Sequence, residues 1–211
     1  ILLLLICYIL NTKYNMIIGI CGPSGSGKSH YSKIFKTKIE SKYTSVKIIH
    51  MDNFFKGISQ YDKFQKEALK KGELSYDEPD IIDIDYLLEF LKSLKNLKSG
   101  ESVKMPVYDF SLFDRLKEDK WITINKTYDV IIVEGIFTFY FEKLRNMFDY
   151  KIYMGTPEPI CFERRINRNV ESRIGPSGKS SKDFEIEYYK KYVYPSYKKY
   201  IEPLKQFADI V

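Results

Sequence analysis

The segment Gly22-Pro23-Ser24-Gly25-Ser26-Gly27-Lys28-Ser29 limits what this chain can fold into more than any other stretch. It matches the pattern GxxxxGK followed by Ser or Thr, which wraps a polyphosphate. The apolar run Met16–Cys21 precedes it and is typical of a buried strand, and apolar side chains at helical spacing follow it between Tyr31 and Ile39. The sequence therefore predicts a strand, a phosphate-binding loop and a helix, in that order.

Glycines suit such a loop because backbone N–H groups hold the phosphates, which requires positive φ values and close approach of the main chain. The following helix presents its unpaired N–H groups and its positive dipole end to the same phosphates. We expect Lys28 to reach the outer phosphates and the Ser29 hydroxyl to ligate Mg²⁺. The alternative, a Gly-Ser turn before a helix, is disfavoured because strand and helix are both in place. The predicted ligands are ATP or GTP and Mg²⁺, bound through Gly22, Ser24, Gly25, Ser26, Gly27, Lys28 and Ser29.

The composition allows one domain with a sizeable core, since the chain has 211 residues and 44% of them are hydrophobic. The net charge of +6 comes from lysines that are spread along the chain, so it suits small anionic ligands and does not indicate nucleic acid. Cys7, Cys21 and Cys161 lack metal-ligand spacing and favour a reducing compartment, which makes the cytoplasm the expected location.

The first residues form an apolar run, Ile1–Leu10, that is about half as long as a membrane-spanning helix. No charged segment precedes this run, so we expect neither a membrane anchor nor a signal peptide. Because the first predicted strand begins at Met16, residues 1–15 are interpreted as an upstream or non-native extension. Residues 16–211 are expected to form the phosphate-loop domain.

Two carboxylates follow predicted strands. Asp52 comes after Val46–His50, and Glu134 comes directly after the buried run Tyr128–Val133. Ligands of open α/β sheets bind at the carboxyl edge, so we expect both carboxylates to face the phosphate loop. Glu134 is then the second candidate ligand of Mg²⁺, beside the loop serine. The alternatives are a helix N-cap for Asp52 and an ordinary strand end for Glu134.

Arginines are concentrated in one segment of a chain that otherwise uses lysine. Four of them, Arg164, Arg165, Arg168 and Arg173, follow a predicted helix start at Thr156. The planar guanidinium fork matches phosphate oxygens in a way that an ammonium cannot. The cluster therefore indicates phosphate recognition, and the alternative is a solvated basic helix face.

The rest of the sequence predicts further elements. Val103–Tyr108 and Trp121–Ile124 form a small hairpin, which we interpret as a flap over the substrate. Gly175–Ser180 repeats part of the phosphate-loop pattern without its first glycine or a preceding strand, and we interpret it as part of a lid. Helices are predicted over Lys63–Lys71, from Asp83 toward Gly100 and over Asp183–Glu202 with a break at Pro195, and strands at Tyr150–Met154 and Phe207–Val211.

Taken together, several blocks in this order resemble the uridine-cytidine kinase family, within the broader group that includes phosphoribulokinase and pantothenate kinase. The resemblance runs from Met16 to Val211. The blocks are the phosphate loop, Met51–Lys56, Tyr76–Asp80, Pro106–Phe110, Val133–Ile136, Arg164–Asn169, Tyr200–Pro203 and Ala208–Ile210. The resemblance implies a three-layer α/β fold with a five-stranded parallel sheet, a hairpin flap and a helical lid. It also implies a homotetramer that phosphorylates the 5′-hydroxyl of a nucleoside with ATP.

The resemblance also implies a role for individual residues. Asp52 would take the proton of the 5′-hydroxyl, and Glu134 would help to hold Mg²⁺. Arg168 and Arg173 would close over the transferring phosphate together with Lys28. The nucleoside would be bound by Tyr76, Asp77, Tyr108, Phe113, Arg165 and Tyr188, with Asp77 and Arg165 on the ribose and Tyr108 stacked beside the base.

The chain departs from the family at the base. Phe113 stands where the family has a His that reads the pyrimidine edge, and Tyr188 stands where it has a Gln. Because hydrogen bonds to the base generate the large specificity ratios, we expect uridine and cytidine to differ by less than about tenfold in kcat/KM. In the lid, Arg173-Ile174-Gly175 replaces Arg-Gly-Arg, so one arginine is missing or replaced by Lys179.

Two alternatives stay open. One is a kinase of the same fold that acts on another hydroxyl, such as that of pantothenate, nicotinamide riboside or a sugar phosphate. The other is a regulatory protein that binds a nucleotide without transferring phosphate, against which the intact Lys28, Asp52 and Glu134 argue. His30 and His50 are not expected to be catalytic, because phosphoryl transfer between oxygens uses positioning and a carboxylate base.

Overall fold

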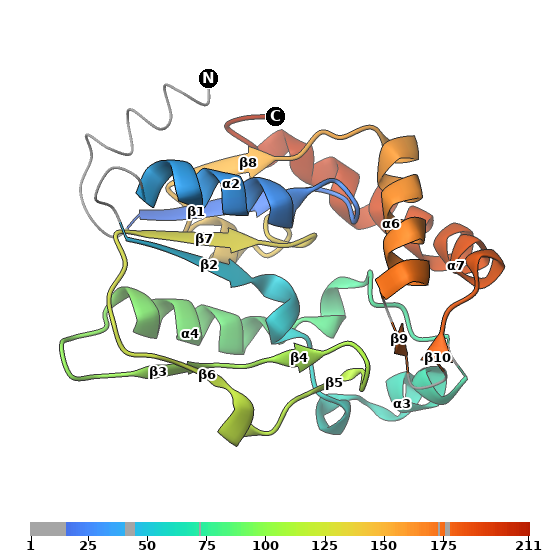
Figure 1. Cartoon of the computed structure of the whole chain (residues 1–211), viewed down its shortest axis with the longest axis horizontal. Helices are drawn as coiled ribbons and strands as arrows, with labels where there is room; N and C mark the ends of the chain where they lie inside the picture. Colours follow the sequence, from blue (N-terminus) through green and yellow to red (C-terminus); the bar gives the residue numbers. More distant parts are fainter. Residues whose placement is uncertain (1–15, 41–44, 72, 173, 176–177) are drawn as a thin grey trace.

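Four strands form one parallel sheet in the computed structural model, which describes residues 16–40, 45–71, 73–172, 174–175 and 178–211. The predicted extension, residues 1–15, lies outside the described residues, as does Arg173. The strands lie in the order β2-β7-β1-β8 (Figure 1) and comprise Val46–His50, Val130–Glu134, Met16–Cys21 and Tyr150–Tyr153. The predicted parallel sheet is therefore confirmed.

The central strand β1 is buried along its whole length because both of its faces are covered. Ile17 and Cys21 belong to the larger apolar cluster on one face, while Ile18 and Ile20 belong to a second cluster on the other. In register, Ile18 pairs with Ile132 of β7 and with Tyr150 of β8. A strand covered on both faces has a continuous apolar sequence, which is the pattern that the sequence displays here.

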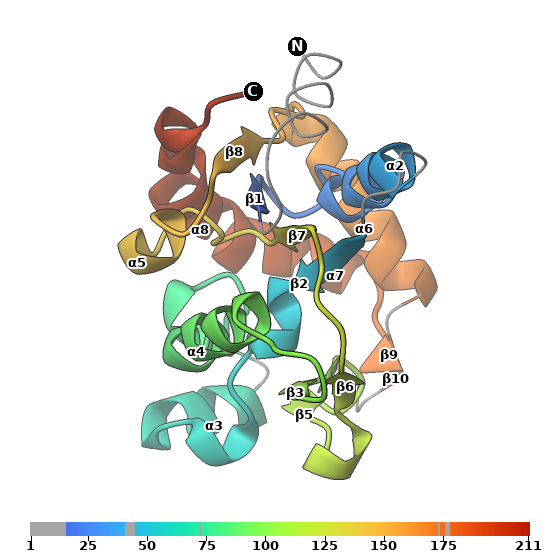
Figure 2. The same cartoon turned by 90° about the vertical axis from the view of Figure 1, so that its left-hand side faces the viewer.

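Helices cover the two faces of the sheet. Helix α2 (Lys28–Glu40) packs its buried side chains Phe35 and Ile39 against one face. Helix α4 (Ile84–Lys95) and the helical segment near the C-terminus contribute to the cluster on the opposite face, and Figure 2 shows α2 and α4 on opposite sides of the strands. The three-layer α/β arrangement predicted from the sequence is confirmed.

The predicted fifth strand is wrong. Instead of a strand over Phe207–Val211, a 3₁₀ helix covers Glu202–Phe207, and a single β-bridge joins Ile210 to Ile152 of β8. The side chain of Asp209 explains the difference, because its carboxylate accepts the backbone N–H of Lys151 at 2.8 Å. This side chain takes the place of a main-chain acceptor, so regular pairing along β8 does not extend.

The expected break at Pro195 is also wrong. Helix α7 (Lys182–Tyr188) continues through π-helical turns and the short helix α8 (Tyr194–Ser196) into a further π turn. Pro195 lies in the first turn of α8, where a missing N–H breaks no bond within that helix. The π turns are Tyr189–Val193 and Tyr197–Ile201.

Below the sheet in Figure 1, short antiparallel pairs form the region where the hairpin was predicted. Strand β3 pairs with β6, and β4 pairs with β5. Helix α4 ends at Lys95, before the predicted stop at Gly100. No helix in the described ranges combines the length and the apolar character needed to cross a membrane. The remaining elements are α3 (Lys63–Lys70), β3 (Val103–Met105), β4 (Tyr108–Asp109), β5 (Asp114–Arg115), β6 (Ile122–Ile124), α5 (Glu142–Arg145), α6 (Glu158–Ser172), β9 (Ile174–Gly175), β10 (Gly178–Lys179), and 3₁₀ turns Met51–Phe54, Ile58–Gln60, Pro79–Ile81 and Glu118–Lys120.

Candidate functional site

One pocket collects side chains from segments that are far apart in the sequence. It lies at the carboxyl edge of the sheet, since the phosphate loop, Asp52 and Glu134 follow the ends of β1, β2 and β7. Its other walls come from the loop that contains Tyr76 and Asp77 and from the arginines of α6. The lining residues are Ser24, Gly25, Gly27, Lys28, Ser29, His30, Asp52, Phe55, Tyr76, Asp77, Phe110, Glu134, Gly135, Ile136, Arg164, Arg165 and Arg168.

The phosphate loop has the backbone shape that its glycines predict. Gly25 has φ +84° and Gly27 has φ +91°, both in the left-handed region that glycine adopts without strain. A Cβ atom on Gly25 would collide with the carbonyl oxygen of Cys161, so helix α6 packs directly on the loop. Thr156, expected as the N-cap of α6, instead donates its hydroxyl to the carbonyl oxygen of Ser26 at 2.9 Å.

Lys28 is buried at the base of this loop. Its Nζ donates to the carbonyl oxygen of Pro23 at 2.9 Å, which holds the ammonium under the turn. Burial lowers the pKa of Lys28, and the negative charges of Glu134 and Asp52 oppose that change. Nearby, the Ser26 hydroxyl is buried and has no hydrogen-bond partner within the described residues. A left-handed loop with an unsatisfied buried hydroxyl and a buried cation fits a polyphosphate.

Ser29 and Glu134 meet, as the magnesium prediction requires. The Ser29 hydroxyl donates to Glu134 Oε1 at 2.8 Å. Burial acts to raise the pKa of Glu134, but the hydrogen bond from His50 and the charge of Lys28 outweigh it and lower the pKa overall. The carboxylate is therefore ionised at neutral pH. One hydroxyl and one carboxylate suit Mg²⁺, which keeps several waters and binds phosphates with few protein ligands.

The contact between His50 and Glu134 was not predicted from the sequence. The Nδ1 atom of His50 lies 2.5 Å from Glu134 Oε1, and the two residues are paired across β2 and β7. The hydrogen bond to Glu134 raises the pKa of His50, against the effect of burial. The signal was available only through strand register, because His50 and Glu134 are 84 positions apart in the chain.

Asp52 lies on the pocket wall, inside the 3₁₀ turn Met51–Phe54. The N-cap of that turn is His50, without a side-chain cap, so the alternative of a capping role for Asp52 is excluded. The carboxylate acts on Lys28, whose pKa it helps to raise against burial. Asp52 thus faces the phosphate-loop lysine, as its position at the carboxyl edge predicted.

Arg165 and Asp77 form a buried ion pair on the opposite wall. The two guanidinium nitrogens lie 3.1 and 3.0 Å from the two carboxylate oxygens, and the residues are 6% and 2% exposed. Burial lowers the pKa of Arg165, but Asp77 raises it above its ordinary value. A solvated helix face is therefore ruled out for Arg165. Arg164 and Arg168 also line the pocket.

The predicted nucleoside-binding residues divide into lining and supporting side chains. Tyr76 lines the pocket, whereas Phe113 stacks on it from behind with ring centroids 5.3 Å apart. Phe113 has φ +52°, an unusual backbone angle for a bulky side chain. The Tyr188 hydroxyl accepts from the backbone N–H of Tyr76 and donates to the carbonyl of Leu74. Tyr108 packs edge-on against Phe55.

Three tyrosine hydroxyls lie near one another at this wall, and Tyr61 among them was not predicted. The hydroxyls of Tyr61, Tyr76 and Tyr108 are buried and have no hydrogen-bond partner of acceptable geometry in the part of the chain described. Burial and the proximity of the other phenols raise the pKa values of Tyr76 and Tyr108, so both groups are neutral. We call these three residues the tyrosine cluster.

Arg115 fixes the β4–β5 pair against the segment that carries Asp52. Its Nε and Nη2 donate to the carbonyls of Phe55 and Phe54 at 2.6 and 3.2 Å. Its Nη1 lies 3.1 Å from Asp83 Oδ2, at the start of α4. The hairpin that was predicted as a flap is thus anchored at its β5 strand.

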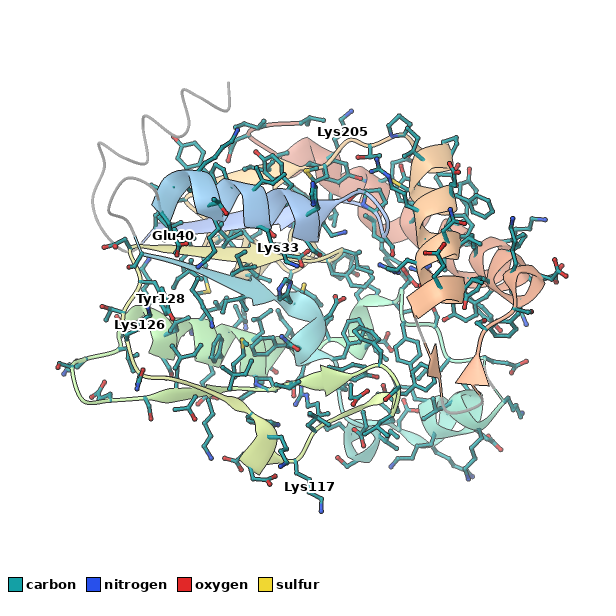
Figure 3. All side chains as sticks on the ribbon, in the orientation of Figure 1. Lys33, Glu40, Lys117, Lys126, Tyr128 and Lys205 are labelled. Atoms are coloured by element: carbon teal, nitrogen blue, oxygen red, sulfur yellow. The ribbon has the colours of Figure 1, made fainter. Side chains whose placement is uncertain are left out.

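The positive charge is dispersed over the molecule. Figure 3 labels Lys33, Lys117, Lys126 and Lys205, which lie at widely separated places in the view. No three His, Cys, Asp or Glu side chains of the described ranges are grouped as a metal site. By contrast, Arg164, Arg165 and Arg168 of α6 lie together along the pocket.

Comparison with known proteins agrees with this geometry. Residues 17–211 match the Phosphoribulokinase / Uridine kinase family. Uridine kinase from Borrelia duttonii is 37% identical over 195 residues, which cover 92% of this chain and 84% of that protein. Uridine kinase from Limosilactobacillus reuteri is 34% identical over 199 residues, which cover 94% and 83%.

A solved structure supports the fold. D-glycerate 3-kinase from Cryptococcus neoformans var. grubii has a TM-score of 0.68 at 15% identity, and the match covers 96% of this chain and 87% of that one. At this identity the likeness concerns the fold and not the acceptor.

Proposed function

The chain belongs to the phosphoribulokinase / uridine kinase family, and on that premise we propose that it phosphorylates the 5′-hydroxyl of a nucleoside with ATP. The observation that carries the proposal is the pocket, because the phosphate loop and the buried pair of Arg165 and Asp77 line the same space. A phosphate donor and a hydroxyl acceptor can therefore meet in one cavity. The product is the nucleoside monophosphate.

On the donor side, the glycine-rich loop and Lys28 would hold the phosphates. Ser29 and Glu134 would hold Mg²⁺, and they fit it because their oxygens already lie together. Bound Mg²⁺ supplies charge neutralisation on the phosphate oxygens. Lys28 is kept at its place by the Pro23 carbonyl, so no side-chain reorganisation is needed before the donor binds.

On the acceptor side, Asp52 would act as the general base that takes the proton of the 5′-hydroxyl. Asp77 and Arg165 would bind the ribose hydroxyls, since a carboxylate accepts and a guanidinium donates. Arg168, with Arg173 beyond the described residues, would stabilise the charge on the transferring phosphoryl group. These roles stay proposals for each residue.

The base would lie against the aromatic wall of Phe55, Tyr76 and Phe110. The hydroxyl of Tyr76, the member of the tyrosine cluster that lines the pocket, would donate to a carbonyl or accept from an amino group. Both pyrimidine edges would therefore satisfy it, which supports uridine and cytidine as substrates. Similarity to two uridine kinases over more than nine tenths of this chain favours a nucleoside over pantothenate, nicotinamide riboside or a sugar phosphate.

The direct test measures ADP release with ATP and Mg²⁺ over a panel of nucleosides, pantothenate, nicotinamide riboside and sugar phosphates. We expect turnover with uridine or cytidine, and none without added acceptor beyond slow hydrolysis. Faster turnover of pantothenate, nicotinamide riboside or a sugar phosphate would show that the acceptor is not a pyrimidine nucleoside. ATP binding without transfer to any of them would favour a regulatory protein.

The oligomeric state, the cellular location and the role of residues 1–15 are also proposals. The resemblance implies a homotetramer, which light scattering after size-exclusion chromatography measures. The cysteine content favours the cytoplasm, which fractionation of cells tests. A protein that begins at Met16 should be soluble and fully active if residues 1–15 are an extension.

A further inference from the structure

Two buried polar side chains beside the pocket have no part in the proposed reaction. Asn169 of α6 is 4% exposed, and Glu185 of α7 is 8% exposed. Asn169 Nδ2 donates to Glu185 Oε2 at 2.8 Å, so the two helices are joined at this point. Burial of a carboxylate is costly unless polar partners compensate it. The burial of Glu185 is therefore expected to have a structural or functional role, because an exposed position would cost less.

The other end of the Asn169 amide contacts a pocket arginine. Asn169 Oδ1 accepts from Arg168 Nε at 3.2 Å and from Arg168 Nη2 at 3.1 Å. Two N–H groups on one oxygen restrain the plane of the guanidinium as well as its position. Because the Glu185 carboxylate oxygen accepts from the amide NH₂, Glu185 holds that NH₂ toward itself and leaves the amide oxygen for Arg168.

We propose that Glu185 and Asn169 are positioning residues that set the direction of the Arg168 guanidinium in the pocket. The inference rests on the proposed function, in which Arg168 acts on the transferring phosphoryl group. Neither residue touches the reacting atoms. Their effect follows from geometry, since displacement of a catalytic group by about 1 Å can cost about a hundredfold in rate.

A simpler role for Glu185 makes a different prediction. Glu185 is one of the acids that raise the pKa of Arg165 against burial, after the larger effect of Asp77. If charge balance at Arg165 were its whole role, loss of the carboxylate would raise the KM for the nucleoside, because Arg165 belongs to the acceptor wall. Loss of the Arg168 orientation lowers kcat instead.

The experiment exchanges the two side chains. Glu185→Leu and Asn169→Asp are compared with the double variant Asn169→Asp/Glu185→Gln, which keeps the net charge and restores the chain of donors and acceptors. We expect each single variant to lower kcat by about 10-fold to 100-fold, with the KM values for ATP and nucleoside changed by less than about threefold. The double variant should return kcat to within about fivefold of the unmodified protein.

The pH profile separates the single variants. Asn169→Asp places two carboxylates together, and they can share one proton at low pH. Its kcat should therefore recover toward lower pH relative to the unmodified protein, whereas that of Glu185→Leu should not. Glu187→Leu is the matched control, since Glu187 is exposed on the same helix, and it should leave kcat unchanged.

Melting temperatures establish whether each variant is folded. Additive losses in the double variant, or a change confined to the nucleoside KM, would overturn the proposal. The same cycle would be measured on the slow hydrolysis of ATP by water, in which Arg168 would act in the absence of a nucleoside. If the unmodified protein phosphorylates no nucleoside, the proposed function fails, while coupling in hydrolysis would still support the positioning role and additivity would reject it.

Discussion

The two ends of the pocket are built in different ways. The donor end is built mainly from one contiguous segment, Gly22–Ser29, whose backbone conformation provides the phosphate-binding surface, and Glu134 joins it from the end of β7. The acceptor end assembles side chains from the segment after β2, the loop at Tyr76, the β4–β5 pair and helix α6. The donor end is thus specified locally, and the acceptor end depends on contacts between distant parts of the chain.

This difference has a physical consequence. Backbone N–H groups bind any polyphosphate with similar geometry, so the donor end needs little adjustment between substrates. The acceptor end depends on aromatic packing and buried polar contacts, where a single side chain changes specificity. Substitutions at the donor end should therefore abolish turnover for every acceptor, while those at the acceptor end should change KM or preference.

The largest effect is expected from Lys28→Ala. It removes the cation at the outer phosphates, and kcat should fall by about a thousandfold or more for every nucleoside. Circular dichroism should show an intact fold, because the lysine bonds only to the carbonyl of its own loop among the hydrogen bonds found for it. If the variant turned over one nucleoside but not another, the donor end would not act equally on every acceptor. An unfolded variant would mean that the buried Lys28 is structural.

A smaller effect is expected at the point where the two ends meet. Asp52→Asn should lower kcat by roughly a hundredfold, the usual scale for a general base, and leave ATP affinity nearly unchanged. Isothermal titration with a non-hydrolysable ATP analogue checks the second part. Unchanged turnover would show that Asp52 supports the site without accepting the proton.

An intermediate case tests whether distant contacts define the acceptor end. Arg115→Gln removes the ties from β5 to Phe54, Phe55 and Asp83. We expect the nucleoside KM to rise about tenfold, from the loss of hydrogen bonds to a charged group, with the KM for ATP unchanged.

Arg145→Gln is the matched control for this variant. Arg145 also donates to a backbone carbonyl, that of Phe139, and lies over the Phe207 ring away from the acceptor wall. Both variants should lose stability by about 1–3 kcal/mol. If Arg145→Gln raised the nucleoside KM as much, the effect would be general destabilisation and not the loss of this anchor.

The same contrast explains what the sequence could predict. The strand before the phosphate loop, the loop and α2 follow from the order of residues, since each depends on neighbours in the chain. Asp52 and Glu134 were placed in the pocket because carboxyl ends of parallel strands meet at one edge. These inferences needed periodicity and one rule of topology.

The features that were not predicted from the sequence depend on two kinds of contact. In one kind, a side chain takes the hydrogen-bonding place of a main-chain group, and in the other, residues far apart in the sequence meet. The fifth strand does not form because the Asp209 carboxylate accepts the Lys151 N–H. The alternation of apolar and polar residues in the sequence does not reveal such a hydrogen bond. The contact of His50 with Glu134 required the register of β2 against β7. Tyr61 joins the tyrosine cluster through packing alone, so its sequence context gave no signal.

The smallest effect is expected at the tyrosine cluster, in the variant Tyr76→Phe. A buried hydroxyl without a partner costs about 1–3 kcal/mol, so its removal should leave the free protein as stable or more stable. If the base satisfies this hydroxyl, the same change should lower kcat/KM for the nucleoside by about fivefold to tenfold. Opposite signs for stability and activity distinguish a substrate contact from a packing role.

Uridine and cytidine should respond alike to this variant. A neutral hydroxyl donates to the carbonyl of one base and accepts from the amino group of the other, so Tyr76→Phe should change the ratio of their kcat/KM values by less than about threefold. Tyr128→Phe is the control, because Tyr128 lies at the opposite edge of the sheet from the pocket (Figure 3) and should change neither value. Phe113→His restores the residue of the family and should raise the preference for pyrimidines if this position reaches the base past Tyr76, whereas an unchanged preference would mean that Phe113 only supports the Tyr76 ring. A thousandfold preference in the unmodified protein would show that a directional group already reads the base, and the acceptor end would then be more sharply specified than the tyrosine cluster allows.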